Sequence, residues 1–158
     1  MSETIVDRIT QITRDLIAAL GLAASAIDTT SKDDGFIVQL QLSPSDSGIL
    51  IGYHAETLNH FQLILSLIVH QQLKSWHRLT VNINDYRQNR EATLTEMAHN
   101  AAERVRLTNK EVVMPYLDSF ERRFIHLALS QETDLETVSL GEGRDRRLVI
   151  RPQSEPHS

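Results

Sequence analysis

The sequence predicts an α+β protein made of two small domains that share one long helix. Several segments place apolar residues at helical spacing, and others alternate apolar and polar residues as half-buried strands do. The 158 residues include 41% hydrophobic side chains, which is enough to pack one domain or two small ones. We expect residues 1–85 to form the first domain, residues 86–151 the second, and residues 152–158 a polar tail.

The first half is expected to fold in the order α-β-β-α-α-β. Apolar residues at helical spacing predict a first helix that ends near residues 20–21 and a later helix over residues 55–72. Strand-forming residues predict strands over residues 27–30 and 36–42. Residues 78–84 alternate strictly, which predicts a half-buried strand. Its inward positions are Leu79, Val81 and Ile83, and its outward positions are Thr80, Asn82 and Asn84.

The second half is expected to fold in the order α-β-α-β-β. A long apolar stripe predicts a helix over residues 86–107. Residues 112–116 form a short strand-like run, and Pro115 within it indicates a position at the edge of a sheet. After a further helix, residues 136–140 and 147–151 are expected to pair as a hairpin.

The helix that precedes this hairpin carries a basic face. Asp118 can cap its start, and Glu121 can complete a capping box. At about 100° per residue, Arg122, Arg123 and His126 share a polar arc without an acid. Arg122 and His126 are four residues apart and are therefore neighbours on the helix surface, suited to holding a phosphate. The apolar face contains Phe120, Phe124, Ile125, Leu127, Ala128 and Leu129.

The overall charge argues against a tight non-specific nucleic-acid binder, because such affinity comes mainly from neutralising phosphates. The formal net charge is −5 and the isoelectric point is about 5.8. Local sign matters more than the total for steering a ligand, however, and charge is unevenly placed here. Residues 144–151 hold Arg144, Arg146, Arg147 and Arg151 against Asp145 alone.

Composition also bears on the compartment. The N-terminal segment has no basic start followed by an apolar block, so we expect no signal peptide. The longest apolar run, residues 61–69, is too short to span a bilayer. The chain has no cysteine, which excludes disulfides and thiolate metal sites. We expect a cytoplasmic protein with no membrane contact.

Metal binding and catalysis have no support in the sequence. His54 and His60 are six residues apart and His70 and His77 are seven apart, so neither pair matches a helical zinc site. No nucleophile–base pair stands in a recognisable setting, and no Gly-rich nucleotide loop is present. We expect no catalytic residue, no metal, no cofactor and no enzymatic activity.

The motif Arg122-x-x-x-His126, set within residues 120–129 and followed by residues 141–147, resembles the R-three-H domain of bacterial Jag-type proteins. The first half resembles the KH domain that precedes it in that family, and the likeness covers roughly residues 1–151. The family usually carries a separate N-terminal Jag domain, which we expect this chain to lack. The resemblance implies a non-enzymatic, cytoplasmic RNA-binding protein.

The KH-like loop departs from the family pattern. A KH loop is normally Gly-x-x-Gly, usually with a basic residue inside, and here it is Gly52-Tyr53-His54-Ala55. Such a loop works by letting backbone N–H groups at a helix start approach phosphates closely. Ala55 would be costly at a positive φ, Tyr53 can stack on a base, and His54 supplies charge only when protonated. We expect this loop to bind more weakly than a standard one.

We therefore predict binding of single-stranded nucleic acid with modest sequence preference, with RNA favoured and DNA as the alternative ligand. Arg122 and His126 would grip phosphate, and Arg123 would add positive field. Further contacts are expected from Gly52, Tyr53, His54, Arg144, Arg146 and Arg147. The alternative is that these residues are ordinary solvent-exposed surface and bind no ligand.

The main alternative function is a protein-interaction scaffold in which RNA binding has decayed. A protein partner, or another copy of the chain in a homo-oligomer, would then dock on exposed surface near residues 112–116. The acidic total charge and the altered loop favour this second hypothesis, whereas the basic helix face favours the first.

Overall fold

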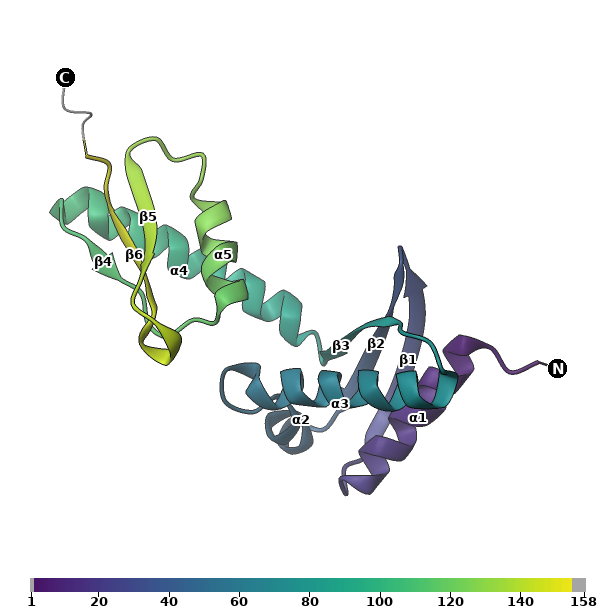
Figure 1. Cartoon of the computed structure of the whole chain (residues 1–158). Coiled ribbons are helices and arrows are strands. Elements are labelled where there is room, and N and C mark those ends of the chain that lie inside the picture. Colours follow the sequence, from purple (N-terminus) through teal and green to yellow (C-terminus); the bar gives the residue numbers. More distant parts are fainter. Residues whose placement is uncertain (1, 155–158) are drawn as a thin grey trace. The chain divides into compact units, whose positions relative to one another are not determined.

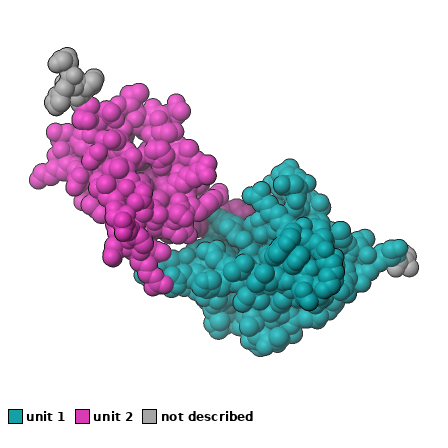
Figure 2. Space-filling model, viewed as in Figure 1, with its two compact units in different colours: residues 1–87 teal, residues 88–158 magenta. Residues whose placement is uncertain are grey.

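The computed structural model describes residues 2–154, and the chain forms two compact units, residues 1–87 and residues 88–158 (Figure 2). Each unit combines helices with one small three-stranded sheet (Figure 1). The predicted α+β class is therefore confirmed. Within the described residues, no helix is long and apolar enough to cross a membrane.

In unit 1, helices cover one face of a mixed sheet (Figure 1). The sheet has the order β1-β2-β3, with β1 and β2 antiparallel and β2 and β3 parallel. Parallel neighbours need a crossover connection, which α2 and α3 supply. The elements are α1 (Ile5–Ala19), β1 (Ala24–Lys32), β2 (Gly35–Leu42), α2 (Pro44–Ile51), the short 3₁₀ helix η1 (Tyr53–Ala55), α3 (Glu56–Leu73) and β3 (Arg78–Ile83).

The helices of unit 1 begin at recognisable caps. The Thr4 hydroxyl accepts from the Asp7 N–H and the Asp7 carboxylate accepts from the Thr4 N–H, which completes a capping box on α1. The Ser43 hydroxyl caps α2, with Pro44 at the first helical position. The hydrophobic core of unit 1 contains Ile9, Leu40, Leu58, Leu65 and Ile83.

Asn82 is buried, although its place in the alternation predicts an outward side chain. Its Nδ2 donates to Gln39 Oε1 at 2.9 Å, and its Oδ1 accepts from the backbone N–H groups of Ile83 and Arg87 at 3.1 and 3.2 Å. These bonds satisfy the amide, which is why its burial is tolerated. They also fix β3 to the first turn of the following helix.

In unit 2, two helices pack on an antiparallel sheet of order β4-β6-β5. The unit boundary falls within the first turn of α4, so nearly all of this helix belongs to unit 2. The core joins Leu94, Ala102, Ile125, Leu148 and Ile150. The elements are α4 (Tyr86–Thr108), β4 (Val112–Val113), α5 (Ser119–Ala128), β5 (Leu135–Leu140), the 3₁₀ helix η2 (Gly143–Asp145) and β6 (Arg147–Pro152).

Two strands of unit 2 differ in length from the prediction. β4 lies at the sheet edge and ends at Val113. The Met114 N–H still donates to the Leu148 carbonyl at 2.9 Å, but Pro115 has no N–H to continue the ladder. β6 extends through Pro152, and the Gln153 N–H donates to the Asp134 carbonyl at 2.9 Å. The rest of the predicted polar tail, residues 155–158, lies outside the described residues, as does residue 1.

α5 does not bury the whole of its apolar face. Glu121, Ile125 and Leu129 face the core, whereas Phe120 and Leu127 are 63% and 57% exposed. The buried side of the helix includes an ion pair, because the Glu121 carboxylate accepts from Arg90 on α4 at 2.6 Å and Glu121 itself is buried.

Candidate nucleic-acid interface

The start of α5 is fixed by the capping box that the sequence predicts. Asp118 Oδ1 accepts from the Glu121 N–H at 2.8 Å, and Glu121 Oε2 accepts from the Asp118 N–H at 3.3 Å. Glu121 thus serves both the cap and the ion pair with Arg90. These contacts fix the rotation of the helix, and they direct its basic face away from the core.

A hollow of about 640 Å³ lies between α5, β5 and the turn before β6. Three of its lining residues are basic side chains on α5, one more is the guanidinium of Arg146, and three carry hydroxyls. Among the residues that the structure describes, no acid lines it. The lining residues are Ser119, Arg122, Arg123, His126, Thr137, Val138, Ser139, Arg146 and Leu148. We call this hollow the α5 pocket. Its charge and its hydroxyl donors suit an anion.

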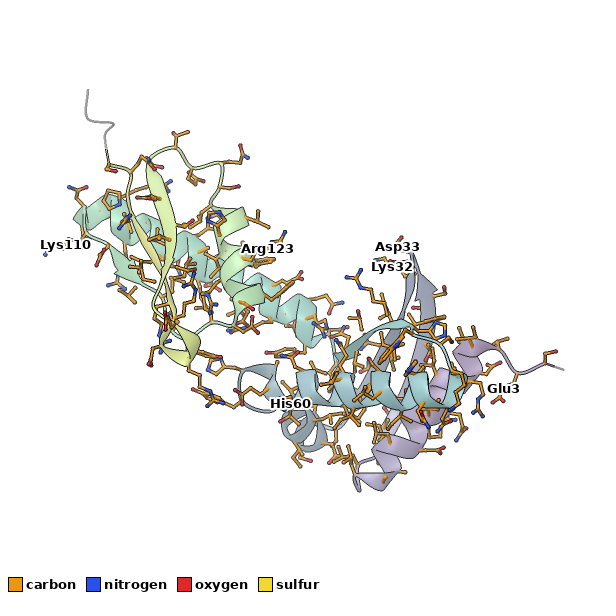
Figure 3. The ribbon with its side chains drawn as sticks, viewed as in Figure 1. Glu3, Lys32, Asp33, His60, Lys110 and Arg123 are labelled. Atoms are coloured by element: carbon orange, nitrogen blue, oxygen red, sulfur yellow. The ribbon has the colours of Figure 1, made fainter. Side chains whose placement is uncertain are left out.

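Arg122 and Arg123 differ in how firmly they are held. Arg122 is half-buried, and its Nη1 donates to the Leu117 carbonyl at 2.7 Å, so one of its five N–H donors is used within the fold. Arg123 is exposed, projects outward from α5 (Figure 3), and forms no ion pair or hydrogen bond with any residue of the described range. Arg122 is therefore preoriented, whereas Arg123 is the more adaptable cation.

The ring of His126 is oriented by a residue that the sequence reasoning missed. His126 Nδ1 forms a short hydrogen bond with the hydroxyl of Thr137 on β5. A neutral imidazole has one N–H donor and one acceptor nitrogen, so the role of Nδ1 in this bond sets the role of Nε2. The strand alternation that pairs Thr137 with Ser139 on one face is the signal that could have indicated them.

The arginine-rich turn contributes one guanidinium to the pocket lining. Arg146 lines it, and its Nη1 donates to the Gly141 carbonyl at 2.8 Å. Arg147 turns back on the turn itself, because its Nη1 donates to the Arg144 and Arg146 carbonyls and its guanidinium lies 5.5 Å from the Tyr116 ring centre. Arg144 and Arg147 do not line the α5 pocket.

The Gly52–Ala55 loop lies in unit 1, between α2 and α3. Gly52 has φ +70°, and a Cβ there would come within 2.1 Å of the Thr57 hydroxyl, so only glycine fits. His54 and Ala55 also have positive φ, 49° and 60°. Ala55 therefore lies in the left-handed region of the backbone, where an alanine is strained, as the sequence analysis anticipated. Tyr53 is 76% exposed, and its ring meets that of His54 edge-on.

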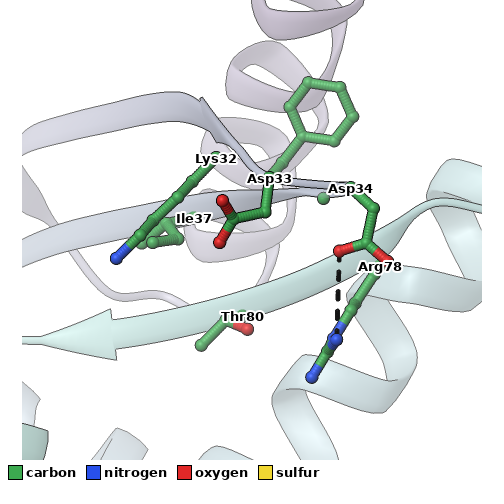
Figure 4. Close-up of a pocket in the computed structure, with 8 residues that line it drawn as sticks. Lys32, Asp33, Asp34, Ile37, Arg78 and Thr80 are labelled. Atoms are coloured by element: carbon green, nitrogen blue, oxygen red, sulfur yellow. Dashed lines mark ion pairs between the residues drawn. The ribbon is translucent and has the colours of Figure 1, made fainter.

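Another hollow, in unit 1, lies at the β1–β2 turn (Figure 4). Both charge signs line it, since Lys32 and Arg78 face Asp33 and Asp34. Arg78 and Asp34 form a loose, exposed pair at 3.9 Å. This mixed lining has no preference for an anion, in contrast to the α5 pocket. Across residues 2–154, no group of three histidine or acidic side chains is placed to hold a metal ion.

Comparison with known proteins gives one family match, and it covers the α5 pocket. Residues 92–152 match the R-three-H domain family. The chain is 30% identical over 148 residues to the RNA-binding protein KhpB of Clostridium symbiosum, covering 94% of this chain and 66% of the relative. It is also 30% identical over 129 residues to KhpB of Bacillus subtilis, covering 80% and 62%.

A third relative, KhpB of Lactiplantibacillus plantarum, is 32% identical over 111 residues, which are 70% of this chain and 34% of that protein. The chain therefore spans just under two thirds of the length of the first two relatives and about a third of the last. All three relatives are named as RNA-binding proteins. These comparisons identify an R-three-H domain over residues 92–152 and show that the chain is similar to proteins named as RNA-binding.

Proposed function

We propose that the protein binds single-stranded RNA through phosphate contacts in the α5 pocket. The observation that carries the proposal is the acid-free lining, in which Arg122, Arg123, His126 and Arg146 converge from one helix and one turn of the described chain. Hydrogen bonds from charged donors to phosphate are about twice as strong as neutral ones, and a guanidinium can make two in parallel. The hydroxyls of Ser119 and Ser139 add donors to the lining.

Each residue has a distinct role in this proposal. Arg122 is held by the Leu117 carbonyl and donates its remaining N–H groups to a phosphate. His126 donates from Nε2, opposite the bond to Thr137. Arg123 and Arg146 add positive field. Arg144 and Arg147, which do not line the pocket, contribute only to the local potential.

Unit 1 is proposed as a KH-like domain, residues 1–85, that precedes an R-three-H-like domain, residues 86–151. The order of helices and strands and the loop between α2 and α3 support this assignment. The strained φ at Ala55 and the absence of Lys or Arg from Gly52 to Ala55 support weak binding by this loop. Stacking by the exposed Tyr53 ring is its main proposed contribution.

The test is titration of a short fluorescent single-stranded RNA at several salt concentrations. The variant Arg122→Ala/His126→Ala should lose roughly ten-fold or more in affinity, and its salt slope should fall by about 0.7 for each lost phosphate contact. Lys110→Ala removes one charge just after the C-terminal end of α4 (Figure 3) and should change little. Equal affinity and slope for the wild type and the double variant would contradict the proposal.

Arg123→Ala gives an independent arm, because Arg122 also holds the backbone at Leu117 and its loss can disturb the fold. Arg123 has no such bond within the described residues, so its removal tests charge alone. A DNA strand of the same sequence tests the preference for RNA. Weaker binding of DNA would indicate contacts to the 2′-hydroxyl.

A protein-interaction scaffold is the second candidate, and one observation favours it. Val113 on the edge strand β4 is 58% exposed, beside a shallow hollow that includes Met97, Met114 and Pro115. Pro115 limits strand addition at this edge, however, because it has no N–H to donate. Co-purified RNA, measured as excess absorbance at the nucleic-acid wavelength, would favour the first function over this one.

A further inference from the structure

We infer that the exposed apolar face of α5, formed by Phe120, Phe124 and Leu127, is a nucleobase-binding surface next to the α5 pocket. The inference rests on the proposed function and goes beyond it, because it assigns a site for the base as well as for the phosphate. Affinity for RNA would then come from base stacking as well as from charge.

The first observation is that Phe120 and Leu127 contribute little to the fold. Phe120 is 63% exposed and Leu127 is 57% exposed, whereas Phe124 is half-buried and packs against the core of unit 2. The core side of α5 is supplied instead by Ile125, Leu129 and the Arg90-paired Glu121. A ring left in solvent on a helix whose rotation is fixed by a capping box is available for a ligand.

The second observation is that this apolar face borders the pocket directly. Arg123 lies three residues after Phe120 and four before Leu127, so the three are neighbours on the helix surface. Arg123 also lines the α5 pocket, as does Ser119, the residue before Phe120. Residues three or four apart on a helix have Cβ atoms roughly 5–6 Å apart. A phosphate held in the pocket therefore brings its own nucleotide, or the adjoining one, close to the exposed face.

Charge complementarity selects the occupant. The neighbouring pocket has no acid among its described lining residues, so a ligand that spans both surfaces needs an anionic part and a flat apolar part joined at short range. A nucleotide has that construction. Base–aromatic stacking is tolerant of sequence, because every base has a π-face, and the three side chains offer no donor or acceptor to read a base edge. This accounts for the modest sequence preference that the proposed function expects.

The experiment compares two probes that have the same phosphates. One is a short single-stranded RNA, and the other is the same strand made abasic. The wild type should bind the intact RNA roughly ten-fold more tightly than the abasic strand. Phe120→Ala should remove most of that difference while leaving the salt slope unchanged, and Phe120→Tyr should retain it. Leu107→Ala, which shortens an even more exposed apolar side chain at the end of α4, should have no effect.

The outcomes separate this inference from the proposed function. If Phe120→Ala binds both strands as the wild type does while Arg123→Ala weakens both, the phosphate site stands and the base site is overturned. If no protein binds either strand, both are overturned. If Phe120→Ala alters only self-association or protein capture, the face is a protein interface and the inference fails. Because Phe120 is exposed, its variant should keep the wild-type unfolding curve, which confirms that binding is tested on a folded protein.

Discussion

At the scale of single residues, the α5 pocket depends on Thr137, which is proposed to orient His126 and not to contact the RNA itself. Thr137 bonds Nδ1 of His126, and this bond decides which ring nitrogen is left as the donor. If the hydroxyl donates to Nδ1, then Nε2 carries the proton and can donate to a phosphate while the ring is neutral. Thr137 is therefore proposed as a positioning residue for His126.

Replacing Thr137 tests that role. Thr137→Val keeps the shape but removes the hydroxyl, and it should lower RNA affinity by about three- to ten-fold, equivalent to one hydrogen bond of about 1 kcal/mol. Thr137→Ser should restore binding, because it keeps the hydroxyl. Nitrogen-15 spectra of the His126 ring should report the Nε2–H tautomer in the wild type and a mixture of tautomers in Thr137→Val. Identical spectra in both proteins would argue against the role.

A second residue-scale feature is the strain at Ala55. An alanine in the left-handed region costs about 1–2 kcal/mol relative to its ordinary conformation, and glycine avoids most of this cost at some expense in chain entropy. Ala55→Gly should therefore raise the free energy of unfolding of unit 1 by about 0.5–1 kcal/mol in urea titration. Gly52→Ala is the contrasting variant, and it should destabilise because its Cβ meets Thr57.

The Ala55→Gly variant also tests function. Ala55→Gly recreates the Gly-x-x-Gly pattern, and it should tighten RNA binding if the loop limits contact with phosphate. Gain of stability without gain of affinity would assign the loop a purely structural role.

At the scale of elements, α5 has three faces with different tasks. One contacts the core, one lines the pocket, and one presents Phe120 and Leu127 to solvent. The capping box, the start of the helix and the basic arc were all predictable, because they depend on residues three or four apart in the sequence. The rotation of the helix was not, because it depends on Arg90, 31 residues before Glu121.

The same reasoning explains what else the sequence could and could not provide. Alternation predicted β3, but the burial of Asn82 depends on Gln39 and on the first turn of α4. Three basic residues of the pocket, Arg122, Arg123 and His126, were found from their spacing on one helix, whereas Thr137 and Ser139 come from a strand whose position beside α5 is set by tertiary packing. Local patterns were predictable, and long-range partners were not.

A cluster of charges ties the end of α4 to the segment before β5. Arg106 donates to Asp134 and to Glu132 at 2.7 Å each. The hydrogen bond from Arg106 lowers the pKa of Asp134 below its ordinary value of 3.8. Because the folded state binds this proton less readily than the unfolded chain, the contribution is present above the ordinary pKa and is lost as pH falls through the lowered value.

The melting temperature should therefore fall as the pH is lowered below about 4, and part of that fall should be absent in Asp134→Asn. The effect should be small and reduced by salt, since the pair is exposed to solvent. Melting curves at several pH values in low salt are the measurement. Identical pH profiles for wild type and variant would show that the pair contributes nothing to stability.

At the scale of the whole molecule, an acidic protein is proposed to bind an acidic polymer. The net charge of −5 opposes non-specific association, so binding must depend on the local cluster in unit 2. If about two or three phosphates are contacted, the logarithm of the affinity should fall with the logarithm of salt with a slope of about −1.5 to −2. A slope near about −5 would instead indicate a broad basic surface that the α5 pocket does not provide.

The strand order of unit 2 has a consequence for biosynthesis. β6 is the central strand of its sheet, and it is the last of the three to be synthesised. β4 and β5 have no direct partner until β6 has left the ribosome, because each pairs with β6 and not with the other. A nascent chain that ends before residue 147 therefore carries a complete sheet in unit 1 and two unmatched strands in unit 2, which exposes the latter to aggregation or chaperone capture until β6 emerges and pairs with them.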